Sequence, residues 1–199
     1  MNRRSVLGEE ERMLVETIHE DVARIRAVAE DFVQVSFVDP HSLKLKISKH
    51  PISELILDWV KPFRIVARDK KVTLEVQRQD HQLIWANIDP VKFPWAVSNL
   101  LSNAVRFSPP ASRITVSISD ADKEVQIEIR DEGPGIPEEI RRKMFDPYFQ
   151  GPVNESSIPS GFLGLGLTIA KEVVEAHQGH IEYHPGNPRG SIFRITLPG

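Results

Sequence analysis

The sequence contains no cysteine among its 199 residues, which excludes disulfide bonds, zinc–thiolate sites and thiol catalysis. No apolar run approaches the ~18 residues that a membrane span requires. The basic start at residues 1–8 lacks the apolar core of a signal peptide. The formal net charge is only -3, so bulk charge predicts no binding to nucleic acid and no membrane contact. We therefore expect a cytoplasmic protein, or the cytoplasmic part of a larger one.

Glycine and proline are also absent from residues 9–36, where apolar residues recur at steps of three and four. This pattern predicts a long amphipathic helix with a narrow apolar seam, typical of a helical bundle or coiled coil. Such a helix cannot bury its seam alone, so we expect it to pair with a second copy of the chain. The helix-breaking Asp39-Pro40 then predicts a boundary between a helical domain at 1–40 and a second domain at 41–199.

The second domain contains some segments in which apolar residues alternate, as in strands, and others in which they recur at helical spacing. This mixture predicts an α+β fold with a mixed sheet rather than alternating βαβ units. Within the helix expected at 53–68, Pro62 predicts a kink or a break. The expected strands are 43–47, 72–76, 83–86, 114–118, 125–129, 180–183 and 191–197, and the expected helices are 53–68, 89–107, 138–143 and 165–177.

The first candidate site lies on the helix expected at 89–107, in the run Asn-Leu-Leu-Ser-Asn-Ala-Val-Arg-Phe-Ser at residues 99–108. Asn99, Asn103 and Arg106 fall at i, i+4 and i+7, so they share one face. Amide oxygens suit Mg2+, and a guanidinium suits phosphate oxygens. Taken alone, this helix favours the alternative of an amphipathic helix whose polar face is simply exposed to water.

The second candidate is Asp131-Glu-Gly133-Pro-Gly135, which follows directly on an expected strand. The two glycines allow the backbone to pass close to a ligand. The Asp131 carboxylate only accepts hydrogen bonds, so it can take the amine proton of adenine but would repel the carbonyl of guanine. A surface turn with a capping aspartate is the alternative interpretation.

The third candidate is Gly-Phe-Leu-Gly-Leu-Gly-Leu at residues 161–167, which opens the helix expected at 165–177. Glycines there would let backbone N–H groups and the helix N-terminus face phosphates. The run follows a loop rather than a strand, which argues against a Rossmann site, and it lacks the Gly-Lys-Ser/Thr of a P-loop. The preceding stretch at 150–163 is too long and too polar for a plain connector.

Taken in order, these motifs resemble the ATP-binding domain of sensor histidine kinases, in the superfamily shared with gyrase B and the ninety-kilodalton heat-shock chaperones. Residues 99–108 are similar to the Asn box, 131–135 to the first glycine box, 145–149 (Phe-Asp-Pro-Tyr-Phe) to the Phe box, and 164–167 to the second glycine box. The resemblance covers about residues 43–198. It implies a two-layer α/β sandwich with a mixed sheet and helices on one face.

The resemblance also implies roles for individual residues. Asn103 would be the side-chain ligand of Mg2+, with Asn99 beside it near the phosphates, and Arg106 would touch the phosphates. The residues that would line the triphosphate, under a lid at 150–163, are Gly164, Leu165 and Gly166.

At the base, the resemblance implies that Asp131 binds the adenine amine. Gly133 and Gly135 would allow close approach of the loop, and Phe107 would pack near the base. Phe149, in the Phe box, would complete the ATP-binding residues.

The implied activity is transfer of the ATP γ-phosphoryl group to a histidine and then to an aspartate of a response regulator. Residues 1–40 resemble the second helix of the family's dimerisation hairpin, with the first helix absent, which implies a homodimer. His19 precedes Glu20 but lacks the family's following proline, so we expect the phosphoacceptor histidine to be absent from this chain. The chain could then be the cytoplasmic part of a membrane-bound sensor.

Two alternatives remain open. The bulky pair Phe162-Leu163 stands where the family usually has a glycine and a hydroxyl residue, which removes flexibility from the expected lid. This pair motivates a degenerate module that binds ATP poorly and acts by pairing with partner proteins. The other alternative is an anti-sigma-type serine kinase of the same superfamily, although that class usually lacks a long preceding helix and a Phe box of this form.

Overall fold

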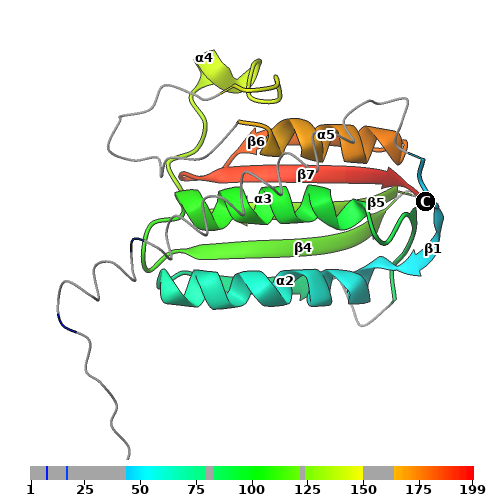
Figure 1. Ribbon diagram of the computed structural model, residues 1–199, viewed down its shortest axis with the longest axis horizontal. Helices are drawn as coiled ribbons and strands as arrows, with labels where there is room; N and C mark the ends of the chain where they lie inside the picture. Colours follow the sequence, from blue (N-terminus) through cyan, green and yellow to red (C-terminus); the bar gives the residue numbers. More distant parts are fainter. Residues whose placement is uncertain (1–7, 9–16, 18–43, 79–82, 122–123, 150–163) are drawn as a thin grey trace, which may run out of the picture.

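The computed structural model describes Gly8, Thr17 and residues 44–78, 83–121, 124–149 and 164–199 (Figure 1). The helix expected at 9–36, with His19, lies almost wholly outside these residues. The lid expected at 150–163, with Phe162 and Leu163, lies outside them as well. Those expectations stay predictions.

The described part is built on a five-stranded mixed sheet in the order β2-β4-β5-β7-β6. β2 runs parallel to β4, and the other three pairings are antiparallel. The strands are β2 (Thr73–Arg78), β4 (Arg113–Ala121), β5 (Glu124–Asp131), β6 (His180–Pro185) and β7 (Ser191–Pro198). A two-stranded sheet of β1 (Ser48–Pro51) and β3 (Trp85–Ile88) completes the strands. This arrangement confirms the α+β expectation.

Three helices cover one face of the large sheet, side by side (Figure 1). They are α2 (Ile52–Asp69), α3 (Phe93–Phe107) and α5 (Gly166–Ala176), and the short α4 (Glu138–Arg141) lies beyond α5. Strand alternation explains the two layers, because Val125, Ile127 and Ile129 of β5 are buried whereas the intervening Gln126 and Glu128 are only half-buried. The expected two-layer sandwich is therefore confirmed.

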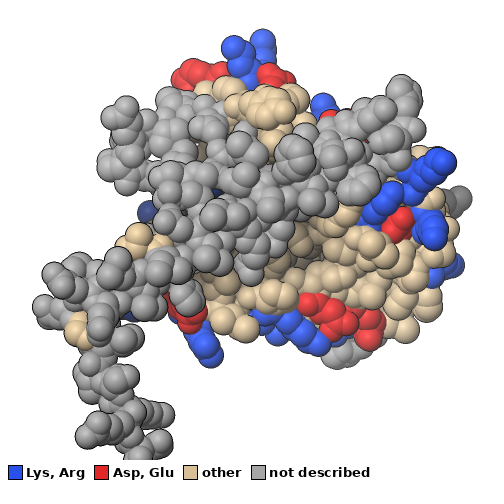
Figure 2. Space-filling view, in the orientation of Figure 1, with Lys and Arg blue, Asp and Glu red and all other residues tan. Residues whose placement is uncertain are grey.

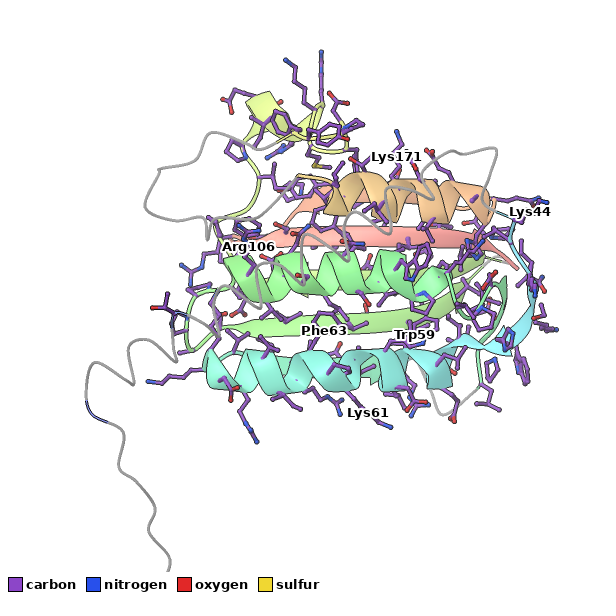
Figure 3. The ribbon with its side chains drawn as sticks, in the orientation of Figure 1. Lys44, Trp59, Lys61, Phe63, Arg106 and Lys171 are labelled. Carbon is purple, nitrogen blue, oxygen red and sulfur yellow. The ribbon has the colours of Figure 1, made fainter. Side chains whose placement is uncertain are left out.

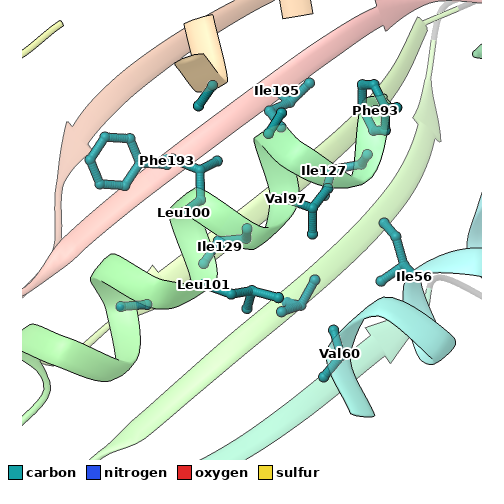
Figure 4. Close-up of a cluster of buried hydrophobic side chains, with 14 of the residues drawn as sticks. Ile56, Val60, Phe93, Val97, Leu100, Leu101, Ile127, Ile129, Phe193 and Ile195 are labelled. Atoms are coloured by element: carbon teal, nitrogen blue, oxygen red, sulfur yellow. The ribbon is translucent and has the colours of Figure 1, made fainter. Parts of the chain in front are cut away.

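The core lies between this sheet face and α3, the central helix (Figure 4). Val97, Leu100 and Leu101 of α3 are at most 1% exposed, and they meet the strand residues Ile127 and Ile195 in one cluster. Because its apolar side is packed in the core, the direction of the polar side of α3 is fixed as well. This matters because α3 carries the candidate Asn box.

The C-terminal end of α3 is tied to the end of α2. Lys70, which caps α2, donates from Nζ to the carbonyl oxygens of Val105, at 3.0 Å, and of Arg106. The two following turns are also joined, because Ala111 donates its N–H to the Lys71 carbonyl at 2.8 Å. These bonds align α2 and α3 at the end where β2 and β4 begin their parallel pairing.

The structure corrects two expectations at the start of the domain. The strand expected at 43–47 is wrong: the strand is β1 at Ser48–Pro51, which pairs with β3 from Ser48 opposite Ile88. Residues 44–47 stay irregular because Lys46 donates its N–H to Asp89 Oδ2 at 2.8 Å instead of to a strand. The register of β1 depends on this long-range pairing and not on the local alternation.

Pro62 does not break α2, which is continuous from Ile52 to Asp69. A proline removes the hydrogen bond to the carbonyl four residues earlier, here that of Asp58. Both Pro62 and Asp58 are exposed, so water can satisfy the freed carbonyl. Of the expected kink or break, the break is therefore wrong.

None of the described helices is long and apolar enough to cross a membrane. On the face shown in Figure 2, acidic and basic side chains lie next to one another along α2, as in the Lys61–Asp58 pair at 2.5 Å. This mixed pattern agrees with the small net charge.

Candidate functional site

The polar face of α3 carries the three residues that the sequence singled out. Asn99 donates from Nδ2 to the Trp95 carbonyl at 2.8 Å, which fixes the orientation of its amide. Asn103 is only 8% exposed, an unusual position for a polar amide on an otherwise apolar helix. Arg106 lies at the end of α3 (Figure 3), where burial lowers the pKa of its guanidinium without discharging it. The structure therefore places two amides and a cation on one helix face.

The start of α5 lies against this face. A Cβ on Gly166 would lie 2.8 Å from Asn99 Oδ1, closer than real side chains approach. Gly166, the first residue of α5, is therefore where the second glycine box meets the Asn box. The pair brings the N-terminus of α5, the end of a helix where N–H groups lack partners within the helix, beside the amide of Asn99.

The Phe box lies against the second glycine box. Gly164 has φ +70°, and a Cβ there would lie 2.7 Å from the Phe149 carbonyl oxygen. Thr168 of α5 donates from Oγ1 to the Phe145 carbonyl at 3.0 Å. Leu165, between Gly164 and Gly166, is 4% exposed and packs in the core. The structure thus brings the Phe box and the start of α5 together.

Asp131 ends β5 and is 4% exposed. Its Oδ1 accepts the N–H of Gly133 at 2.8 Å and the N–H of Ser191 at 3.2 Å. Burial nevertheless raises the pKa of the carboxyl above its ordinary value, against the opposing effect of the Gly133 and Ser191 hydrogen bonds. The carboxylate is thus held in a fixed position, with one oxygen engaged by the backbone.

The first glycine box joins Asp131 to α3. A Cβ on Gly133 would lie 2.8 Å from Asp131 Oδ1 and 2.9 Å from the Phe107 carbonyl oxygen. The side chain of Phe107 is 47% exposed, and the Arg106 guanidinium carbon lies 5.6 Å from its ring centroid. The end of α3 and the end of β5 therefore meet at Gly133, which must lack a side chain.

These contacts define the extent of the site along α3. One end, near Phe107, lies at the buried carboxylate, and the other, near Asn99, lies at the start of α5. The eight intervening residue steps correspond to about 12 Å at ~1.5 Å per residue. Asn103 lies between the two ends. Gly133 and Gly166, one from each glycine box, contact α3 at these two ends.

The sequence did not point to the turn between β6 and β7, which contacts Asp131. Gly190 has φ +104°, and a Cβ there would lie 1.9 Å from the Asp131 carbonyl oxygen, so only glycine fits. Its neighbour Ser191 donates to the carboxylate. The available signal was the Gly190-Ser191 step at the start of the strand expected at 191–197.

Sequence reasoning also missed a buried contact at the start of α3. His177 is 2% exposed and accepts the Asp89 N–H at Nε2, at 3.0 Å. Its Nδ1 therefore carries the ring proton and donates to the Val173 carbonyl at 2.6 Å. Asp89 in turn accepts the N–H of Val91 and of Lys92 across a turn at residues 90–92, and the helix expected from residue 89 begins only at Phe93.

Comparisons with known proteins agree with this geometry. Residues 88–199 match the family of histidine kinase-, DNA gyrase B- and HSP90-like ATPases. The sensor protein KdpD of Clostridium acetobutylicum is 31% identical over 185 residues, which is 93% of this chain but only 20% of KdpD. The chain thus spans about a fifth of that relative.

Two solved structures show the same architecture. A mycobacterial sensor histidine kinase, MprB, is 29% identical and superposes with a TM-score of 0.63, covering 77% of this chain and 97% of that one. The histidine kinase ThkA, solved in complex with the response regulator protein TrrA, is 19% identical with a TM-score of 0.70, covering 100% of this chain and 53% of that one. At that identity, the second likeness concerns the fold alone.

Proposed function

The chain belongs to the family of histidine kinase-, DNA gyrase B- and HSP90-like ATPases, as the ATP-binding catalytic domain of a sensor histidine kinase, and on this premise we propose what it binds and what it does. It binds ATP with Mg2+ along the polar face of α3. It transfers the γ-phosphoryl group to a histidine that this chain does not contain, from which a response-regulator aspartate receives it. It works in the cytoplasm as a homodimer, paired through residues 9–36.

The observation that carries this proposal is the continuous line of contacts from Asp131 to Gly166 by way of α3. Gly133 joins the carboxylate to the end of α3, and Asn99 joins the same helix to the start of α5. A purine at the carboxylate would direct its phosphates along α3 toward the helix N-terminus. A helix N-terminus favours anions, so the two ends of the site suit the two ends of ATP.

Asp131 is the residue to which we assign the purine. Two backbone N–H groups hold its Oδ1 in place, so the carboxylate does not need to reorganise on binding. As an acceptor-only group, it favours the exocyclic amine of adenine over the carbonyl of guanine. Phe107, beside it at the end of α3, has an exposed ring available to pack near the base.

The donor set fits Mg2+ bound mainly through phosphate oxygens. Among the described residues, no group of three or more histidine or acidic side chains could hold a metal ion. The nearly buried amide of Asn103 supplies one hard oxygen on the same face as Asn99 and Arg106. When bound, the ion would offset the negative charge of the phosphates.

The remaining residues of the site position the nucleotide. Arg106 places a permanent positive charge at the end of α3, and Gly164 and Gly166 leave the backbone at the start of α5 accessible to phosphates. Catalysis in phosphoryl transfer depends mainly on positioning and charge stabilisation, so the chain needs no nucleophile of its own. The reported complex of ThkA with a response regulator supports a partner of that class here.

The test compares Asp131→Ala with Asp120→Ala, an exposed aspartate of β4, in titrations with a labelled ATP analogue and Mg2+. A hydrogen bond to a charged group contributes about 1.5–3 kcal/mol, so Asp131→Ala should weaken binding roughly ten- to a hundredfold while Asp120→Ala changes nothing. Asn103→Ala should abolish the Mg2+ dependence of binding. Unchanged affinity in Asp131→Ala would contradict the adenine role. The absence of saturable binding by the wild-type chain would favour the degenerate module.

A further inference from the structure

The loop between β5 and α4 is held at Ile136 by two side chains that the proposed function does not use. Ile136 donates its N–H to the hydroxyl oxygen of Tyr183, on β6, at 3.0 Å. Its carbonyl accepts the Nε–H of Arg141, on α4, at 2.9 Å. Both main-chain polar groups of one loop residue are thus satisfied by side chains from two different elements. We name Ile136, Tyr183 and Arg141 the Ile136 clasp.

The two side chains of the clasp also contact each other. The guanidinium carbon of Arg141 lies 5.4 Å from the ring centroid of Tyr183, within the range of a cation–π contact. The same ring packs edge-on against Phe193, its cross-strand neighbour, with centroids 5.5 Å apart. Phe193 is 5% exposed and belongs to the core cluster (Figure 4). The clasp is therefore anchored in the folded core and not in a surface turn.

The clasp lies next to the glycines of the candidate purine site. Gly135 has φ +76°, and a Cβ there would lie 3.7 Å from the Tyr183 hydroxyl and 3.0 Å from the Gly190 carbonyl oxygen. Gly133, two residues earlier, contacts the carboxylate of Asp131. A glycine-containing loop has high conformational freedom, so its shape must come from contacts such as these.

We propose that Tyr183 and Arg141 are positioning residues, which hold the loop at 133–136 in the conformation that accepts a purine beside Asp131. This inference rests on the proposed function. By fixing the loop before the nucleotide arrives, the clasp reduces the ordering that binding would otherwise require. Because Arg141 belongs to α4, the clasp also fixes α4 relative to the purine site.

Tyr183→Phe tests the hydroxyl alone, because it retains the ring that packs on Phe193 and beneath Arg141. In the full chain, amide exchange at Ile136 should become about tenfold faster or more. Affinity for ADP should fall about three- to tenfold, which is the range for one neutral hydrogen bond. The factor by which Mg2+ strengthens ADP binding should not change, because the substitution does not alter the phosphate end of the site. Thermal unfolding checks that the variant remains folded.

Arg141→Met tests the other half of the clasp, with Arg142→Met, its exposed neighbour, as the matched control. Arg141→Met should weaken ADP binding to a similar degree, and Arg142→Met should not. Because both residues act through Ile136, the double variant Tyr183→Phe/Arg141→Met should lose less than the product of the two single losses.

Two results would overturn the inference, and they are distinguishable. If Tyr183→Phe exchanges faster at Ile136 but binds ADP as tightly as the wild type, the clasp is a structural feature only. If the wild-type chain itself binds no ADP, the proposed function fails and the positioning role fails with it.

Discussion

Gly166 and Asn99 touch so closely that neither position is independent of the other. A Cβ on Gly166 would lie 2.8 Å from Asn99 Oδ1. Asn99 cannot simply move away, because its Nδ2 is hydrogen-bonded to the Trp95 carbonyl at 2.8 Å. The contact links α3 to α5 at the point where we place the phosphates.

Gly166→Ala should therefore destabilise the chain, although alanine has a higher helix propensity than glycine. On propensity alone the substitution would stabilise a helix by up to about 1 kcal/mol. Overpacking against a fixed side chain costs about 1–3 kcal/mol, so the net change should be a loss, measured by urea unfolding.

The control for that prediction removes the contact from the other side. In an Asn99→Ala background, the added Cβ of Gly166→Ala has no amide to meet, so the same substitution should be neutral or stabilising. An equal loss in both backgrounds would show that the contact with Asn99 is not the cause.

Lys70→Met should loosen the end of α3. The lysine donates to the carbonyls of Val105 and Arg106, which have no partners within the helix. We expect a loss of about 1–3 kcal/mol in the free energy of unfolding and faster amide exchange in the last turn of α3. Lys71→Met, at an exposed neighbour, is the matched control and should leave both unchanged.

His177 should make stability depend on pH. Burial lowers the pKa of its imidazole below the ordinary 6.5, because the protonated ring would be desolvated; it would also lose its ability to accept the Asp89 N–H. The folded chain then binds fewer protons than the unfolded chain, so stability is fully present above pH 6.5 and falls as the pH drops below it. Urea unfolding at pH 7.5 and pH 5.5 measures the difference.

The variant His177→Gln can still accept the Asp89 N–H but does not titrate. It should therefore flatten the pH dependence, whereas His180→Gln, at an exposed histidine, should retain it. If the stability of His177→Gln depended on pH as strongly as that of the wild type, His177 would not be the cause of the pH dependence.

Asp131→Asn should stabilise the chain at neutral pH while weakening ATP binding. Burial raises the pKa of Asp131, so the folded state binds the proton more readily than the unfolded state does. Stability therefore falls as the pH rises above the ordinary 3.8 and through the folded pKa. Asparagine keeps an oxygen for the two backbone donors without the buried charge.

The measurement compares the free energy of unfolding of Asp131→Asn and wild type at pH 7 and near pH 3.8, with Asp120→Asn as the control for a lost surface charge. The gain should be present at pH 7 and shrink toward pH 3.8. A gain in Asp120→Asn as well would point to overall charge and not to the buried site.

The motif residues could be predicted from the sequence because their chemistry is local. Asn99, Asn103 and Arg106 share a face through helical spacing alone, and Asp131 follows directly on an alternating strand. The same locality explains the failure at β1, where alternation over 43–47 gave way to a pairing with β3 that lies far along the chain.

What the sequence alone determined was the α+β class and the residues that could meet a nucleotide. Only the tertiary structure decided how those residues are held: Gly190 and Ser191 beneath Asp131, Lys70 at the end of α3, and the Tyr183–Arg141 clasp on Ile136. The reason is physical. A helix or strand period places side chains within one element, whereas these supports join atoms on different elements, and nothing in local spacing sets the distances between them.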